Sequence, residues 1–540
     1  MSARRYTVVV IALLLYVPVI QAVSSGKWLS LSPSWQWDGI DGMWSTFEVE
    51  IGDPGQKVRL LPGTSAYTGN VVSVVTPPGC SRYPAAANCT GSRGNVFSSN
   101  ASSTWSTRGL PDGGESELDD PVESALGSTG SVSYGFDTLR FPCPDVPLVA
   151  NLLVAEYATE DFWLGSLGLS PVTSNYSGAH VSAPSLLSVL RHRGGIGGLS
   201  WAYTAGAYYR QVFGSLTLGG YDASRLDAMK SITVPFASDP SRDLVLGVQS
   251  MTYDTPGSTP LGGGFYAFID SMVSQMWLPA SVCERFEQAF NLTWNSTCEL
   301  YLVTDEAHAN LIELNPTVTF TVGGADALAD GQTIDIDIPY AAFDLNISAP
   351  LVEKSSRYFP LKRANSSSDY TLGRVFLQAA YLFADYDRSE FRVSQALYPE
   401  SYDRKTLVAV DSPHKAHLGK AEIAGCVVLL VVFAGSCAVF GTTILLRKKR
   451  SRVQRQLASS LAEKDAIVDE KADAIHSLSL CSAASTPSVA ELSGIETQIH
   501  EAQTQDRDRP ELSETKRASI RHELPVEVVA VELDGHSCSI

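Results

Sequence analysis

Side chains that commonly carry catalysis or bind metals are scattered through this chain of 540 residues. The sequence pairs none of its nine histidines with a nucleophilic serine or cysteine, and no Cys/His spacing resembles a metal site. The glycine-dense stretch 194–198 lacks the Lys-Ser/Thr of a phosphate-binding loop, so we interpret it as a turn. The sequence therefore predicts no cofactor and no metal, which leaves carboxylates as the candidate catalytic groups.

Five segments occur in order between residues 47 and 387. They are residues 47–56 (FEVEIGDPGQ), 163–169 (WLGSLGL), 214–222 (GSLTLGGYD), 267–279 (AFIDSMVSQMWLP) and 372–387 (LGRVFLQAAYLFADYD). Together they resemble the pepsin-like aspartic peptidases. The resemblance implies a mostly β, bilobal fold with a cleft between the lobes, in which each lobe supplies one aspartate loop.

Peptide cleavage by this family needs two carboxylates that share one proton and hold a water between them. One of them stays protonated because like charges so close cannot both ionise, while the other activates the water. Asp270 followed by Ser271 is similar to the second of the two loops. Met272 and Val273 then replace the expected Gly and Thr or Ser, and we expect Met272 to crowd the approach of the other loop.

The first catalytic aspartate is missing. An ungapped count from Gln56 places Gly63 at its position, with Thr64 matching the next residue, and a one-residue slip would place Pro62 there. Neither alignment supplies a carboxylate, because residues 54–111 contain no Asp or Glu.

Two further active-site features differ from the family. Asn70 stands where the family usually has Trp, and counting back from residues 135–138 puts Ala125 or Leu126 at the position of the flap tyrosine. The sequence therefore predicts that peptidase activity is absent.

The elements that must position these loops are short strands. Residues 23–400 alternate apolar and polar side chains between frequent turn signals, as in 47–51 and 317–322, which predicts a mostly β domain. Residues 185–191 and 281–290 are predicted helices.

Two apolar segments predict insertion in a membrane. Residues 1–22 have a basic start, an apolar run and a small-residue cleavage site, as a signal peptide does. Residues 423–446 carry no charge, are long enough for a transmembrane helix, and precede a basic cluster at 447–452. We expect a single-pass type I protein of the plasma membrane or secretory pathway, with a stalk at 401–422 and a cytoplasmic tail at 447–540. This organisation resembles a fungal member of the group.

Sequons and cysteines agree with that division. All the Asn-x-Ser/Thr sequons lie before the predicted span, which makes them candidate glycosylation sites: Asn88, Asn100, Asn175, Asn291, Asn295, Asn346 and Asn365. Two cysteine pairs close in sequence are candidate disulfides: Cys80 with Cys89, and Cys283 with Cys298. Cys143 is left over, either free or belonging to a different pairing.

The main functional hypothesis is a surface binding or sensing glycoprotein without peptidase activity. It would hold an extended peptide or a cell-surface ligand between the lobes by strand-like pairing. The alternatives are an active membrane-tethered endopeptidase with an atypical site and a structural cell-surface glycoprotein. The net charge of −18 argues against a nucleic-acid partner, and the sequence names no partner for the tail.

Overall fold

The structure is a computed structural model. It describes residues 26–479 and 536–537, apart from 66–70, 84–87, 118–125, 127–128, 144–145, 147, 177–180, 256–258, 403 and 414–419. The chain divides into two compact units, Met1–Pro413 with Val531–Ile540, and His414–Ala530. The predicted signal peptide, residues 1–22, lies outside the described residues.

The first lobe of the first unit is built on an eight-stranded sheet. Its order is β2 (Pro33–Asp38), β3 (Trp44–Ile51), β4 (Gln56–Gly63), β9 (Ser166–Gly168), β5 (Val72–Val75), β8 (Val149–Tyr157), β7 (Ser131–Arg140) and β6 (Glu115–Glu117). β9 lies between β4 and β5, parallel to the first and antiparallel to the second.

The second lobe repeats this arrangement. Its seven-stranded sheet has the order β22 (Thr333–Pro339), β21 (Thr317–Gly323), β16 (Val245–Tyr253), β17 (Phe265–Ile269), β26 (Thr371–Leu372), β18 (Met276–Leu278) and β25 (Leu361–Arg363). β26 is parallel to β17 and antiparallel to β18, as β9 is to β4 and β5. A four-stranded sheet follows the order β19 (Thr293–Asn295), β20 (Leu300–Leu302), β24 (Ser356–Phe359) and β23 (Leu345–Ile347).

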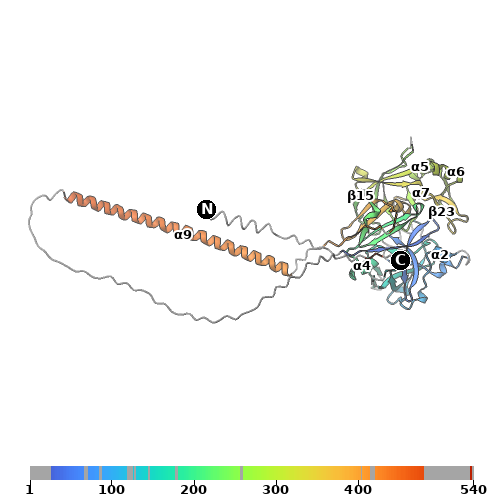
Figure 1. The fold of residues 1–540 in the computed structure, drawn as a ribbon, viewed down its shortest axis with the longest axis horizontal. Helices are drawn as coiled ribbons and strands as arrows, with labels where there is room; N and C mark the ends of the chain where they lie inside the picture. The colour runs from blue at the N-terminus through green and yellow to red at the C-terminus, as the bar shows by residue number, and fades with distance from the viewer. Residues whose placement is uncertain are drawn as a thin grey trace, which may run out of the picture. The chain divides into compact units, whose positions relative to one another are not determined.

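A second seven-stranded sheet carries strands from both halves of the unit. Its order is β15 (Leu226–Pro235), β28 (Glu390–Ala396), β27 (Ala380–Asp385), β12 (Ser200–Ala207), β13 (Val212–Leu218), β1 (Leu29–Leu31) and β30 (His536–Ser537). One continuous apolar core includes residues of the eight-stranded sheet and of both seven-stranded sheets. Figure 1 shows the blue elements of the first lobe and the yellow elements of the second on opposite sides of this unit. The predicted mostly β, bilobal architecture is confirmed.

Helices and short elements complete the first unit. The helices are α2 (Cys89–Ser92), α4 (Leu186–His192), α5 (Ala280–Phe290), α6 (Asp305–Leu314), α7 (Tyr340–Phe343) and α8 (Arg374–Ala379). The 3-10 turns are η2 (Pro77–Cys80), η4 (Ser99–Ala101), η5 (Pro111–Gly114), η6 (Tyr208–Arg210), η7 (Ala223–Arg225), η8 (Ala327–Ala329) and η9 (Ser367–Asp369). Two-stranded ribbons join β10 (Ser174–Tyr176) to β11 (Val181–Ala183) and β14 (Gly220–Asp222) to β29 (Leu407–Ala409). α4 and α5 coincide with the two predicted helices.

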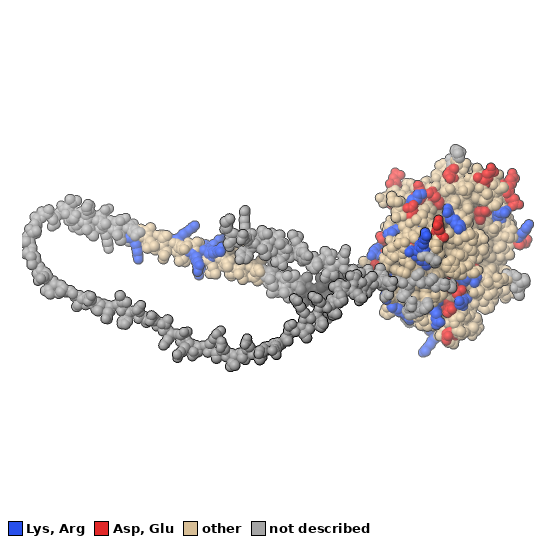
Figure 2. All heavy atoms as spheres, viewed as in Figure 1, with Lys and Arg blue, Asp and Glu red and all other residues tan. Residues whose placement is uncertain are grey.

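The second unit contains the long helix α9 (Lys420–Ser479), which includes the predicted span. A search of the described part of the chain finds no helix that combines the length and the apolar character needed to cross a membrane. The side chains of residues 423–433, the first part of the predicted span, lie outside the described residues. The basic side chains that follow Leu446 are exposed along α9 (Figure 2).

The structure corrects the cysteine predictions in part. Cys80 and Cys89 form a disulfide, whereas Cys283 and Cys298 are both free thiols. The predicted Cys283–Cys298 pair does not form because the two side chains enter different apolar clusters. Cys283 is buried on α5, where its thiol donates to the carbonyl oxygen of Lys362 at 3.4 Å. Cys143 is disulfide-bonded rather than free.

Most of the predicted sequons have the exposure that glycan attachment requires. The exposed ones are Asn88, Asn100, Asn291, Asn346 and Asn365. Asn295 is half-buried, and its side-chain oxygen accepts a hydrogen bond from the Thr297 N–H at 2.9 Å. The Asn175 side chain lies outside the described residues. Glycan attachment itself stays a prediction.

Candidate active site

The two predicted aspartate loops meet at the centre of the first unit. The Thr64 N–H donates to Ser271 Oγ at 3.0 Å, and the Ser271 N–H donates to Thr64 Oγ1 at 2.9 Å. Ser271 Oγ in turn donates to the Pro62 carbonyl oxygen. These reciprocal bonds join residues 207 positions apart and are buried, so each loop satisfies the polar groups of the other.

Strand register gives the same correspondence independently. Pro62 pairs with Leu167 in the first lobe, and Ile269 pairs with Leu372 in the second. In both lobes the residue on the paired strand, Leu167 or Leu372, is a leucine followed by glycine. The residue that follows Pro62 is Gly63 and the residue that follows Ile269 is Asp270, so these two residues occupy equivalent positions.

Only one of the two positions carries a carboxylate. Asp270 is fully buried, and its Oδ1 accepts a hydrogen bond from the Met272 N–H at 2.8 Å. Its own N–H donates to the Leu372 carbonyl oxygen at 3.1 Å. Gly63 has no side chain to share a proton with Asp270. The two loops are therefore joined by their backbone and hydroxyl groups, but only the Asp270 loop supplies a carboxylate.

Met272 lies where the family has glycine, and its side chain packs across the lobes. It contacts an apolar cluster that contains Leu61 and Leu164 of the first lobe with Leu345 and Tyr358 of the second. It also packs against a second cluster that includes Phe162. Apolar side chains of this protein thus fill part of the space between the lobes beside Asp270.

Arg374 is a site residue that the sequence analysis missed. It occupies a variable position of the Leu-Gly-x-x-Phe-Leu segment and begins α8. Its Nη1 donates to the carbonyl oxygens of Ser271 and Met272, each at 2.8 Å, and its Nη2 pairs with Asp41 Oδ2 at 3.2 Å. The guanidinium also stacks over the Trp44 ring, 4.8 Å from its centroid. The signal that could have identified Arg374 is a charged residue within an otherwise apolar segment.

Part of the flap region lies against the Asp270 loop. Leu126 packs in one apolar cluster with Val273 and Trp277. The alternative flap position, Ala125, and the predicted tryptophan replacement, Asn70, lie outside the described residues. A leucine here offers apolar contact but no hydroxyl to bind a substrate.

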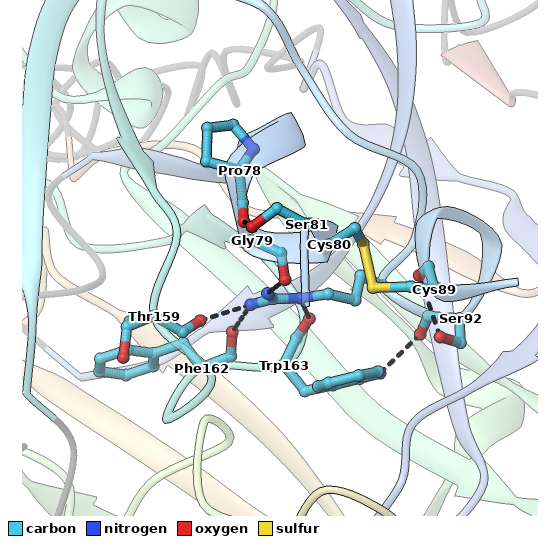
Figure 3. Close-up of a disulfide and its surroundings, with 10 residues drawn as sticks. Pro78, Gly79, Cys80, Ser81, Cys89, Ser92, Thr159, Phe162 and Trp163 are labelled. Carbon is cyan, nitrogen blue, oxygen red and sulfur yellow. Dashed lines mark hydrogen bonds between the residues drawn. A yellow bond between two sulfur atoms is a disulfide. The ribbon is translucent and has the colours of Figure 1, made fainter. Parts of the chain in front are cut away.

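A buried arginine shapes the wall opposite this loop. The Arg93 guanidinium donates to the carbonyl oxygens of Gly79, Thr159, Phe162 and Trp163 at 2.6–3.0 Å. Figure 3 shows these carbonyl groups converging beside the Cys80–Cys89 disulfide. Arg93 therefore fastens the segment 159–163 to the disulfide loop.

A pocket of about 180 Å³ remains between these parts. Its lining includes Asp41, Leu126, Glu160, Asp161, Phe162, Trp163, Met272, Val273, Trp277, Lys362 and Arg374. It is smaller than the usual pocket for a drug-sized ligand, at roughly 300–1,000 Å³. Its size suits a single amino-acid residue or another small group.

Comparison with known proteins agrees with this geometry. Residues 203–397 match the model of the eukaryotic aspartyl protease family. This part of the chain, which contains Asp270 and Arg374, is thus similar to the domain of that family. A search of curated proteins finds no match. Among solved structures, the aspartic proteinase from Irpex lacteus matches with 16% identity and a TM-score of 0.47, covering 69% of this chain and 99% of that one.

Proposed function

We propose that this aspartyl protease family member has no peptidase activity and acts as a binding protein. The observation that carries the proposal is Gly63 at the position equivalent to Asp270, in loops held by the Thr64–Ser271 hydrogen bonds. A single carboxylate cannot both activate a water and donate a proton to the substrate carbonyl. The Met272 side chain adds a second obstacle, because it occupies space beside Asp270 that a substrate would need.

The site that remains for a ligand is the pocket lined by Leu126, Met272 and Trp277. Apolar side chains fill part of the space between the lobes. Only a short part of a peptide or cell-surface ligand can therefore enter the pocket. Family membership alone does not assign this function. The support comes from the lost carboxylate together with a retained pocket.

We also propose that the protein is a single-pass membrane glycoprotein of fungal type. Its support is in the sequence: the segment 423–446 followed by basic residues, the signal-peptide pattern of residues 1–22, and sequons confined to one side of the segment. In this orientation residues 23–400 face outward, the tail at 447–540 lies inside, and binding outside is reported through the tail.

A cleavage assay tests the absence of peptidase activity. The purified full chain and its Asp270→Asn variant are incubated with a broad peptide library from pH 3 to pH 7. We expect no cleavage by either protein when circular dichroism shows that both are folded. Cleavage by the wild type that Asp270→Asn abolishes would overturn the proposal and favour an active peptidase with an atypical site.

A further inference from the structure

A second pocket opens on the first lobe, away from the candidate active site. Its volume is about 450 Å³, against about 180 Å³ for the pocket beside Met272, and the two have no lining residue in common. It lies where η4 meets β6 and the adjacent ends of β7 and β8. We call it the Asn100 pocket, after a residue of its lining.

Two carboxylates line the Asn100 pocket from neighbouring strands. Glu115 on β6 and Glu156 on β8 both pair with Ser133 on β7, so the three side chains share one face of the sheet. Glu115 Oε1 accepts from Ser133 Oγ at 2.7 Å, and Glu156 Oε1 accepts from Ser99 Oγ at 2.9 Å. No ion pair among the described residues includes either carboxylate. Because a carboxylate accepts several hydrogen bonds, both can accept more from a ligand.

The lining combines these acceptors with apolar surface. Burial raises the pKa of Glu156 and the charge of Glu115 adds to that rise, while hydrogen bonds from Ser99 oppose it. The lining also includes the buried aromatic residues Phe97 and Tyr157. A ligand that suits both surfaces carries several O–H or N–H donors next to apolar C–H groups, as a sugar ring does.

One predicted glycosylation site lies in the wall of this pocket. Asn100 is exposed, lines the pocket and begins an Asn-x-Ser sequon. It directly follows Ser99, which donates to Glu156, so a sugar attached to Asn100 starts beside that carboxylate. The other exposed sequon residues are absent from the lining: Asn88, Asn291, Asn346 and Asn365.

We propose that the first N-acetylglucosamine of a glycan on Asn100 occupies this pocket and stabilises the first lobe. Attachment forms a bond from Asn100 Nδ2, which loses a proton, to the anomeric carbon of the sugar. The bond from that carbon to the phosphate of an activated sugar donor breaks, and the phosphate keeps the electron pair. The hydroxyl and amide groups of the sugar donate to Glu115 and Glu156, and its C–H face lies against the apolar part of the lining.

The size of the pocket agrees with this occupant. Its volume equals that of about 15 waters, and one N-acetylglucosamine has a similar number of non-hydrogen atoms. The inference rests on the proposal that the protein is a membrane glycoprotein, and it gives one of the glycans a structural role.

The rate of glycan release at each site tests the proposal. The full chain is made in a eukaryotic secretory host, and release by an amide-cleaving glycosidase is followed by mass spectrometry of the glycopeptides. In the folded protein we expect release from Asn100 to be at least about 10-fold slower than from the exposed Asn365, because hydrogen bonds in the pocket must break first. The two rates should become equal on unfolding. Equal rates in the folded protein, or an Asn100 that carries no glycan, would overturn the proposal.

Variants and thermal unfolding check the contacts. Glu156→Gln removes the charged acceptor and should speed release from Asn100 by about 3-fold or more, while the exposed control Glu353→Gln leaves it unchanged. Asn100→Gln should lower Tm by about 2 °C or more, and Asn365→Gln should not. Trimming every glycan to its first sugar should leave Tm unchanged. A Tm that Asn100→Gln leaves unchanged would refute the stabilising role.

The same samples separate this inference from the proposed glycoprotein. Glycans at other sequons together with fast release at Asn100 would refute the pocket assignment and leave the glycoprotein proposal standing. A chain without a glycan at any sequon would refute both.

Discussion

Gly63 and Asp270 hold equivalent places in two loops that bond to each other through Thr64 and Ser271. Asp270 carries a carboxylate, while Gly63, at the equivalent place, has no side chain. At this scale the proposed absence of peptidase activity rests on that single difference.

Restoring that group should make stability depend on pH. We expect Gly63→Asp to be less stable than the uncharged Gly63→Asn by about 1–3 kcal/mol at pH 7, and nearly equal to it at pH 3. A carboxylate beside Asp270 raises the folded-state pKa of one of the two carboxyl groups. The unfolded chain then releases this proton at a lower pH than the folded chain, so the stability of the fold falls as pH rises. Urea unfolding at both pH values measures the difference. A difference that does not change with pH would mean that position 63 does not face Asp270.

Asp243 gives a second pH-dependent prediction. It lies just before β16 and is 9% exposed, and burial raises its pKa to about 7. The unfolded chain loses this proton near pH 4, so the contribution to stability is present below pH 4 and is lost as pH rises to about 7. We therefore expect Asp243→Asn to stabilise the protein at pH 8 by at least about 1 kcal/mol, and to have little effect at pH 3.5. Thermal unfolding at the two values checks this, and an equal effect at both would contradict it.

At the scale of elements, the pocket depends on segments that have little regular structure. The segment 159–163 and the disulfide loop are joined through Arg93, which is 1% exposed. The first lobe supplies this wall and the second lobe supplies the Asp270 loop, so the pocket forms only when both lobes are folded.

Removing the Arg93 guanidinium should loosen the wall. Arg93→Met leaves buried carbonyl oxygens without donors, and we expect a loss of about 3 kcal/mol in the free energy of unfolding. The matched control is Arg82→Gln, which removes an exposed arginine with a long contact to Glu160 and should cost less than about 0.5 kcal/mol. Similar losses for the two variants would show that Arg93 does not hold this segment.

For the whole molecule, the proposed membrane span conflicts with one contact of the structure. β30 pairs with β1 through Leu29 and Ser30. A bilayer crossed by residues 423–446 would separate these strands, because β1 precedes the segment and β30 follows it. The pairing and the span therefore exclude each other within one inserted chain.

A protease-protection assay decides between them. In sealed vesicles with the sequons inside, we expect added protease to remove the tail after Leu446. The part of the chain before the span should stay protected and shift in size on deglycosylation. Detergent should expose the whole chain as a control. Complete protection of a C-terminal tag in sealed vesicles would contradict the type I orientation.

Several features could be read from the sequence because they depend on residue order or composition. The alternating apolar residues and the five ordered segments predicted a bilobal β fold. Because residues 54–111 contain no Asp or Glu, the sequence predicts that the first catalytic aspartate is absent, whichever alignment is used. The sequence also predicts that Met272 crowds the paired loop, because it stands where the family has glycine.

Tertiary structure decided what those residues contact. Cys283 and Cys298 are close in sequence, yet their side chains point into different clusters and form no disulfide. Arg374 reaches Asp41 and the carbonyl of Ser271 from far along the chain, and Trp277 and Lys362 meet only because β18 and β25 are adjacent. The sequence by itself predicted a mostly β fold from local alternation, two lobes from the resemblance of five segments, and the absence of a carboxylate at position 63 from the residue type. The pocket required the folded chain, because side-chain direction and long-range contacts are set by packing.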